Sequence, residues 1–172
     1  MDHQLEGDAL ARLPQGDLRL LDTPLAQRLL ASTIPARMAY TAHDGTPRIV
    51  PTWFHWTGTE LVMATFLAAP HVAGPARRVP ALREHPGVAV TIDTESFPPE
   101  VLLLRGRVGI AEADGVAEEY AAAARRYLGE EEAAGYLGYV GQPGTRMARI
   151  ALRPAWVGLL DFQTRSPGAL QT

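Results

Sequence analysis

Residues 48–56 read Arg-Ile-Val-Pro-Thr-Trp-Phe-His-Trp, and residues 60–65 read Glu-Leu-Val-Met-Ala-Thr. Both runs are rich in β-branched and aromatic residues, which favour strands, and the Thr-Gly-Thr between them is a turn signal. A preceding strand is expected over residues 37–41, with a His-Asp-Gly hairpin turn shortly after it. Two hairpins in succession predict an antiparallel meander. Pro51 lies inside the second strand, which indicates an edge, a bulge, or backbone left free for a ligand.

The flanking sequence extends this pattern into one mainly β domain. Further strands are predicted over residues 88–93, 101–111 and 146–161, the last one bent or split near Pro154. Because consecutive hairpins cannot bury both faces of a flat sheet of this size, closure into an antiparallel barrel is expected.

Helices are expected at three places around this sheet. Asp22-Thr23-Pro24 offers a capping oxygen and a proline preset for a first helical turn. A short helix over 76–84 follows a loop over 66–75, and two helices form an insertion over about 114–139. The domain organisation expected is a flexible leader over 1–20, one domain over 21–165 and a tail over 166–172.

Composition excludes several classes of function. The chain of 172 residues has a net charge of −3, so no whole-molecule attraction to nucleic acid or an anionic membrane is expected. It contains no cysteine, which excludes disulfides, thiolate nucleophiles and Cys-ligated metals. No signal peptide and no membrane span are evident, so a cytoplasmic protein is expected. The five histidines show no metal-binding spacing, and no protein nucleophile or other catalytic residue stands out.

Arginines around the early strands are candidates for binding a phosphate. Arg48 opens the second strand, while Arg77 and Arg78 begin the short helix after the loop. Guanidinium groups form bidentate, charge-assisted hydrogen bonds to phosphate oxygens, and Thr65 could add a hydroxyl from the same rim. Equally, the arginines of that helix could form a solvated face.

The aromatic run over residues 53–56 has two interpretations as well. By alternation, Trp53 and His55 would face one side of the strand and Phe54 and Trp56 the other. One pair could fill the barrel, and the other could meet a partner subunit or a ring-shaped ligand. Core packing is the commoner role of aromatic residues in strands.

Taken together, these segments resemble the pyridoxamine-phosphate-oxidase-like, FMN-binding split-barrel proteins. The resemblance covers about residues 25–162, and it is carried by residues 48–56, 60–65, 77–93, 104–108 and 147–162 in that order and spacing. It implies a six-stranded antiparallel split barrel, homodimeric, with two flavins at the subunit interface.

The resemblance also implies which residues hold the cofactor. Arg48 would contact phosphate or ribityl oxygens, and the backbone of Val50, Pro51 and Thr52 would bind the isoalloxazine edge, beside Trp53. Ala64 and Thr65 match the phosphate-side pair of the family. Arg77 and Arg78 match its basic pair, in which the second residue is commonly lysine. Glu100 stands where some members place a glutamine from the partner subunit.

The resulting hypothesis is an FMN-binding oxidoreductase that transfers hydride to or from a small organic substrate. One alternative is an F420-dependent reductase on the same fold, in which the extra arginines would hold the longer anionic tail. Another is a non-catalytic flavin- or haem-binding protein, with His71 as the candidate haem ligand. No arginine–histidine pair for pyridoxal phosphate is apparent near the C-terminus, which argues against the vitamin B6 reaction itself.

Overall fold

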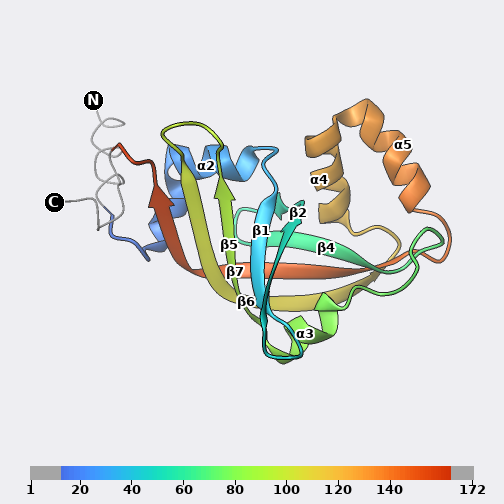
Figure 1. The fold of residues 1–172 in the computed structure, drawn as a ribbon. Coiled ribbons are helices and arrows are strands. Elements are labelled where there is room, and N and C mark those ends of the chain that lie inside the picture. The colour runs from blue at the N-terminus through green and yellow to red at the C-terminus, as the bar shows by residue number, and fades with distance from the viewer. Residues whose placement is uncertain (1–12, 164–172) are drawn as a thin grey trace.

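A seven-stranded antiparallel sheet forms the body of the molecule in the computed structural model, which describes residues 13–163 (Figure 1). The strands run, in chain order, β1 Ala36–Thr41, β2 Pro47–Thr52, β3 His55–Trp56, β4 Leu61–Ala68, β5 Gly87–Asp93, β6 Val101–Asp114 and β7 Arg146–Leu160. Their order across the sheet is β2-β1-β5-β6-β7-β4-β3. The mainly β class is thus confirmed.

Helices lie around this sheet, as Figure 1 shows. They are the 3-10 helix η1 Leu18–Asp22 and the α-helices α2 Pro24–Ala31, α3 Arg78–Glu84, α4 Glu118–Leu128 and α5 Glu130–Val140. The predicted start of α2 is confirmed, because the Thr23 side chain caps the helix by accepting a hydrogen bond from the backbone N–H of Ala26. Within residues 13–163, no helix combines the length and hydropathy required to cross a membrane.

The two outermost strands of the sheet, β2 and β3, are separated in the chain by only Trp53 and Phe54. Two residues span about 7 Å when fully extended. The sheet must therefore curl until its edges come close together, although the strand order ends at β2 and β3 without a pairing between them. The expected closed barrel of six strands is instead an open, curled sheet of seven.

The crossing at Trp53 and Phe54 also corrects the prediction of one continuous strand over residues 48–56. Phe54 turns into the core, where its side chain is fully buried, and this turn interrupts the strand. Phe54 and Trp56 nevertheless both contact the main core, as the predicted alternation places them on one side. Pro51 lies on β2, an edge strand, as one of the three interpretations of this proline predicts.

The register between the long strands β6 and β7 shifts by one residue at a β-bulge. Arg105 pairs with Trp156 and Gly106 with Pro154, which leaves Ala155 as an extra residue. A Cβ at Gly106 would lie 2.5 Å from the carbonyl oxygen of Arg153, so the close approach of the two backbones requires glycine. β7 is consequently one strand with an irregularity near Pro154, rather than two strands.

The main core lies inside the curled sheet. Buried hydrophobic residues from β1, β4, β5, β6 and β7, together with η1, α2 and α3, contribute to it; the largest are Phe54, Leu20, Leu30, Met38, Leu61, Met63, Leu82, Ile92, Leu102, Leu104 and Ile150. Phe54 enters this core from the crossing between β2 and β3. The core therefore fixes the crossing, which matters for the site described below.

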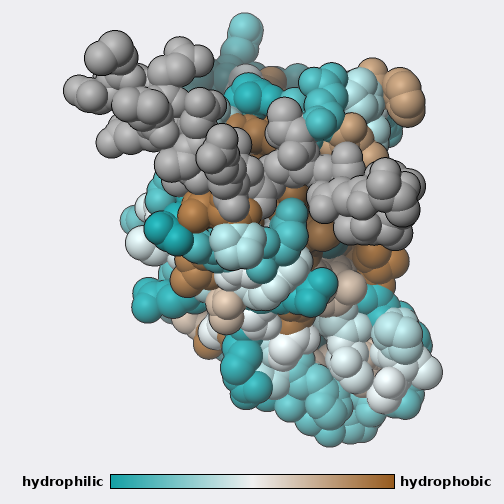
Figure 2. Space-filling view, turned by 90° about the vertical axis from the view of Figure 1, so that its left-hand side faces the viewer, coloured by the Kyte–Doolittle hydropathy of each residue, from teal (hydrophilic) through white to brown (hydrophobic). Residues whose placement is uncertain are grey.

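Residues 13–20, which the sequence analysis assigns to a flexible leader, pack against the end of β7. The Gln15 side chain donates to the carbonyl of Leu159 and accepts from its N–H, at 2.7 and 2.8 Å, and Leu20 is fully buried. Figure 2 views the molecule from this end, where hydrophobic residues form separate patches between hydrophilic ones. Residues 1–12 of the expected leader and the expected tail over 166–172 lie outside the described residues.

Candidate functional site

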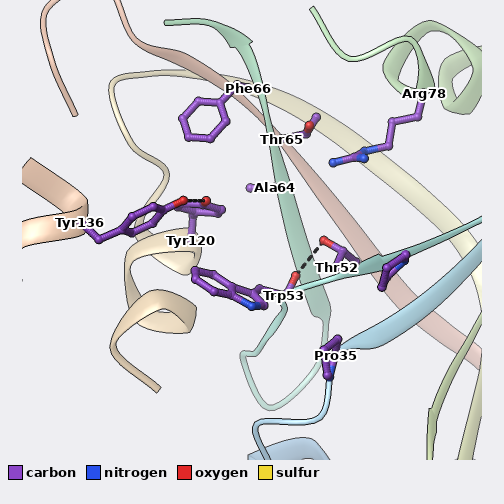
Figure 3. A pocket seen from close by; sticks show the side chains of 10 residues that line it. Pro35, Thr52, Trp53, Ala64, Thr65, Phe66, Arg78, Tyr120 and Tyr136 are labelled. Carbon is purple, nitrogen blue, oxygen red and sulfur yellow. Dashed lines mark hydrogen bonds between the residues drawn. The ribbon is translucent and has the colours of Figure 1, made fainter. Parts of the chain in front are cut away.

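A cavity of about 390 Å³ opens beside the crossing from β2 to β3 (Figure 3). Its volume lies in the range typical of small-molecule sites. The lining combines residues from the segment before β1, from β2, the crossing and β4, and from three helices: Pro35, Pro51, Thr52, Trp53, Ala64, Thr65, Phe66, Arg78, Tyr120 and Tyr136. The curl of the sheet brings these segments together, because β2 and β4 reach the cavity from opposite ends of the strand order.

One end of the cavity is cationic. Arg78, in the first turn of α3, is half-buried, and its guanidinium points into the cavity near Thr52 and Thr65 (Figure 3). Within residues 13–163 it has no ion pair or hydrogen bond, whereas Arg83 of the same helix pairs with Glu112 at 2.5 Å. Burial lowers the pKa of Arg78, although the nearby Tyr40 acts in the opposite direction.

This arrangement favours an anion at the Arg78 end. A guanidinium that is partly removed from water without a counter-charge destabilises the fold, and a bound anion would offset that penalty. The Thr65 side chain is 7% exposed and lines the same end of the cavity. A cation and a hydroxyl side by side are suited to the oxygens of a phosphate.

The other end of the cavity is aromatic. The Trp53 ring stacks on Tyr127, with 5.1 Å between ring centroids and 13° between planes. Tyr120 and Tyr136 lie against the same indole at 6.1 and 5.8 Å, and their hydroxyl groups are hydrogen-bonded to each other. Trp53 is therefore held on one face by a tyrosine cluster and contributes a flat wall to the cavity.

These tyrosines are not among the site residues predicted from the sequence. A signal is nevertheless present, since four of the five tyrosines lie between residues 118 and 140. Tyr120 and Tyr127 are seven residues apart, about two turns, and so share one face of α4. What the sequence alone does not show is that this face meets Trp53.

Ion pairs attach α4 to the sheet beside the cavity. Arg149 of β7 binds Glu119 of α4 at 2.6 Å and Glu60, just before β4, at 3.1 Å. Farther along α4, Arg126 donates to the carbonyl of Phe54, and the Tyr127 hydroxyl donates to that of Ile34 at 3.0 Å. These contacts position Tyr120 over the cavity, because Tyr120 directly follows Glu119.

The Glu119–Arg149 pair predicts a measurable dependence of stability on pH. Burial, the largest single cause, raises the pKa of Glu119, but the hydrogen bond and charge of Arg149 together with a backbone hydrogen bond outweigh it, so the net pKa is below the usual 4.5. A carboxyl whose pKa is lowered by folding stabilises the folded state above its unfolded pKa, and this contribution is lost as pH falls through the folded pKa. We expect the free energy of unfolding to fall less steeply below about pH 4.5 in Glu119→Gln than in the unsubstituted protein.

The measurement is urea denaturation at a series of pH values between about 3 and 7. Glu118→Gln is a matched control, because it removes a neighbouring carboxylate of the same helix whose side chain has no ion pair within residues 13–163. Parallel curves for the unsubstituted protein and Glu119→Gln would show that the pair makes no such contribution.

The cavity brings together six of the ten residues predicted to bind the cofactor: Pro51, Thr52, Trp53, Ala64, Thr65 and Arg78. The other four do not line it. Arg48 is exposed and pairs with Asp44 at 3.0 Å, and Val50 packs against the core. Arg77 caps α3 and is exposed, and Glu100 pairs with Arg28 at 2.7 Å. Contacts of these four residues with a cofactor stay predictions.

His71, the candidate haem ligand, does not line the cavity either. Its ring lies 4.9 Å from Phe66 and 5.2 Å from Tyr139, measured between ring centroids. Its Nδ1 atom is buried and has no hydrogen-bond partner within residues 13–163. The ring thus packs behind Phe66 and leaves the haem interpretation without support from the cavity.

Comparison with known proteins relates the chain to others through structure. No protein-family model matches the sequence, and no curated protein matches it either. Among solved structures, an F420 reductase superposes with a TM-score of 0.57 at 22% identity, covering 77% of this chain and 94% of its own.

Two further structures share the architecture at 14% identity. A pyridoxamine 5'-phosphate oxidase-related, FMN-binding protein from Nostoc punctiforme has a TM-score of 0.53 and covers 89% of this chain and 87% of its own. The haem storage protein HutZ from Vibrio cholerae has a TM-score of 0.53, with 80% and 92% covered. The shared architecture agrees with the resemblance noted in the sequence. The chain has the fold of the pyridoxamine 5'-phosphate oxidase-like, FMN-binding split-barrel proteins.

Proposed function

We propose that this chain is a flavin-binding oxidoreductase that holds FMN in the cavity beside Trp53. The observation that carries the proposal is the half-buried guanidinium of Arg78, which lacks a counter-charge within residues 13–163 and points into a cavity with an aromatic far end. FMN has the matching arrangement, since a dianionic phosphate and a flat ring system lie at its two ends.

Each part of the cavity would have a distinct task. Arg78 and Thr65 would bind the phosphate, while Trp53 would lie beside the isoalloxazine ring. Pro51 and Thr52 belong to an edge strand, so backbone groups on its unpaired side are available to the polar edge of the ring. When bound, the flavin supplies hydride transfer to or from a small organic substrate, and the protein supplies orientation and electrostatics.

The simplest test is the visible absorbance spectrum of the purified protein, followed by mass spectrometry of any molecule that heat releases. Flavin absorbance, or stoichiometric FMN binding in a titration of colourless protein, is expected. A protein that is colourless and leaves both FMN and F420 free in equilibrium dialysis would refute the proposal.

One observation favours F420 as the second candidate cofactor. Arg77 is exposed immediately beside Arg78, and it has no ion pair within residues 13–163. A tail longer and more anionic than that of FMN could continue from Arg78 onto Arg77. Tighter binding of F420 than of FMN, with Arg77→Met weakening only F420, would favour this alternative.

We further propose that two copies of the chain enclose the flavin. Ile49 lies on the edge strand β2 and is 66% exposed, so its side chain is available to pack against a second subunit. If both subunits line the site, dilution to monomer releases the flavin. Flavin fluorescence and light scattering measured on the same dilution series check this, and a monomer that retains its flavin would contradict it.

A further inference from the structure

Two tyrosine hydroxyl groups meet at the aromatic end of the cavity. Tyr120 projects from α4 and Tyr136 from α5, and the only hydrogen bond that either hydroxyl makes within residues 13–163 joins them to each other. Each hydroxyl carries one proton that it can donate. One of the two protons lies in the shared hydrogen bond, so the other has no acceptor in the described part of the protein.

Among residues 13–163, the remaining lining contains no carboxylate, imidazole or carboxamide side chain, which are the stronger acceptors for this proton. The Thr52 hydroxyl is directed to the carbonyl of Trp53 at 3.1 Å, and Arg78 can only donate. The side chains of the lining therefore offer several donors, and a bound molecule can supply an acceptor oxygen to the tyrosine pair.

The two donor regions differ in charge and are separated in space. Figure 3 shows Arg78 near Thr65 on one side, the tyrosine pair on the other, and Ala64 between them. Burial, together with the hydrogen bond between Tyr120 and Tyr136, raises the pKa of Tyr120, so its hydroxyl stays protonated at neutral pH. Arg78 is suited to a full anion such as phosphate, whereas the pair offers a neutral donor beside the flat walls of Trp53 and Phe66.

We propose that the Tyr120–Tyr136 pair recognises a planar conjugated ligand through a carbonyl or phenolate oxygen and so sets the ligand class at this end of the cavity. The proposal rests on the proposed flavin function only for the origin of that oxygen. It can belong to the substrate or to the isoalloxazine ring, because both are conjugated systems with oxygen acceptors.

The probe is 4-nitrophenol, whose phenol and phenolate forms differ in visible absorbance. A donor pair stabilises the bound phenolate, so the bound ligand is expected to lose its proton at lower pH than the free one. In the double variant Tyr120→Phe/Tyr136→Phe this shift is expected to vanish, and the phenolate to bind about tenfold more weakly. Each single variant is expected to give an intermediate result, because the remaining hydroxyl is released from the pair and can still donate.

Tyr139→Phe is the matched control. It removes a hydroxyl from the same helix, but Tyr139 is 56% exposed and does not line the cavity, so the shift should be unchanged. Circular dichroism establishes that the double variant is folded. The proposal is overturned if the unsubstituted protein does not bind 4-nitrophenol, or if the shift survives in the folded double variant. It is equally overturned if only Arg78→Met removes the shift.

An FMN titration of the same variants separates the two origins of the oxygen. If the double variant binds FMN about tenfold more weakly and 4-nitrophenol competes with FMN, the pair contacts the isoalloxazine ring. If FMN affinity is unchanged and both molecules bind together, the pair contacts the substrate. A protein that binds no flavin but keeps the tyrosine-dependent shift of 4-nitrophenol would refute the flavin function and leave this inference intact.

Discussion

Arg78→Met is expected to weaken FMN binding by roughly 10- to 150-fold, which corresponds to about 1.5–3 kcal/mol for hydrogen bonds to a charged group. Methionine keeps most of the apolar stem and removes the only charged side chain that residues 13–163 contribute to the cavity lining. Because this guanidinium is partly desolvated without a counter-charge in residues 13–163, its loss should not lower the stability of the flavin-free protein. The substitution therefore separates binding from folding.

Fluorescence titration gives the flavin affinity, and thermal unfolding with and without FMN gives the stabilisation by the ligand. FMN should raise the melting temperature of the unsubstituted protein more than that of Arg78→Met, since ligand stabilisation follows the dissociation constant. Arg83→Met is the matched control, because Arg83 belongs to the same helix but is paired with Glu112. Equal flavin affinity in Arg78→Met and Arg83→Met would exclude the phosphate role of Arg78.

The sequence predicts the strands of this fold well, because alternation and turn residues are local signals. It fails at the crossing over Trp53 and Phe54, where composition still favours a strand. Period-two alternation describes how side chains point from one strand. It does not show that the chain leaves one edge of the sheet and joins the other, since that step depends on which distant strands pair.

The residues of the candidate site likewise fall into those that local sequence signals predict and those that depend on how distant segments pack. Thr52 and Thr65 lie on strands that the sequence predicts, Trp53 directly follows the first of these strands, and all three line the cavity. Tyr120 and Tyr136 come from helices more than 60 residues farther along the chain than Trp53, and periodicity does not show where a helical insertion folds back.

Arg48, whose contact with a cofactor stays a prediction, lies outside the cavity for a local reason. It stands four residues after Asp44, on the other side of the hairpin turn, and the turn brings the two into an ion pair. A carboxylate at the head of a turn and an arginine just beyond it are close enough to compete with a more distant ligand. The spacing of Asp44 and Arg48 around the predicted turn is visible in the sequence, so this ion pair can be predicted from it.

Phe54→Ala is expected to lower the free energy of unfolding by about 3–5 kcal/mol, the range for removing a buried aromatic side chain. Phe54 is fully buried, its ring meets that of Tyr127 edge-on at 6.4 Å, and the Arg126 guanidinium lies 4.5 Å from the ring centroid. Because small domains are stable by only about 5–15 kcal/mol, the loss would be a large part of the total.

The same substitution should disturb the cavity, because Phe54 anchors the crossing that presents Trp53. Flavin affinity is expected to fall in the fraction of Phe54→Ala that remains folded, and Phe54→Leu should retain more of both stability and affinity. Phe97→Ala is the control, because it is the same substitution at an exposed position. Phe97 is 97% exposed, so its loss should alter the free energy of unfolding by no more than about 0.5 kcal/mol. Urea unfolding measures all three variants. If Phe54→Ala unfolded at the same urea concentration as Phe97→Ala, the crossing would not be fixed by the core, and the placement of Trp53 at the cavity would need another cause.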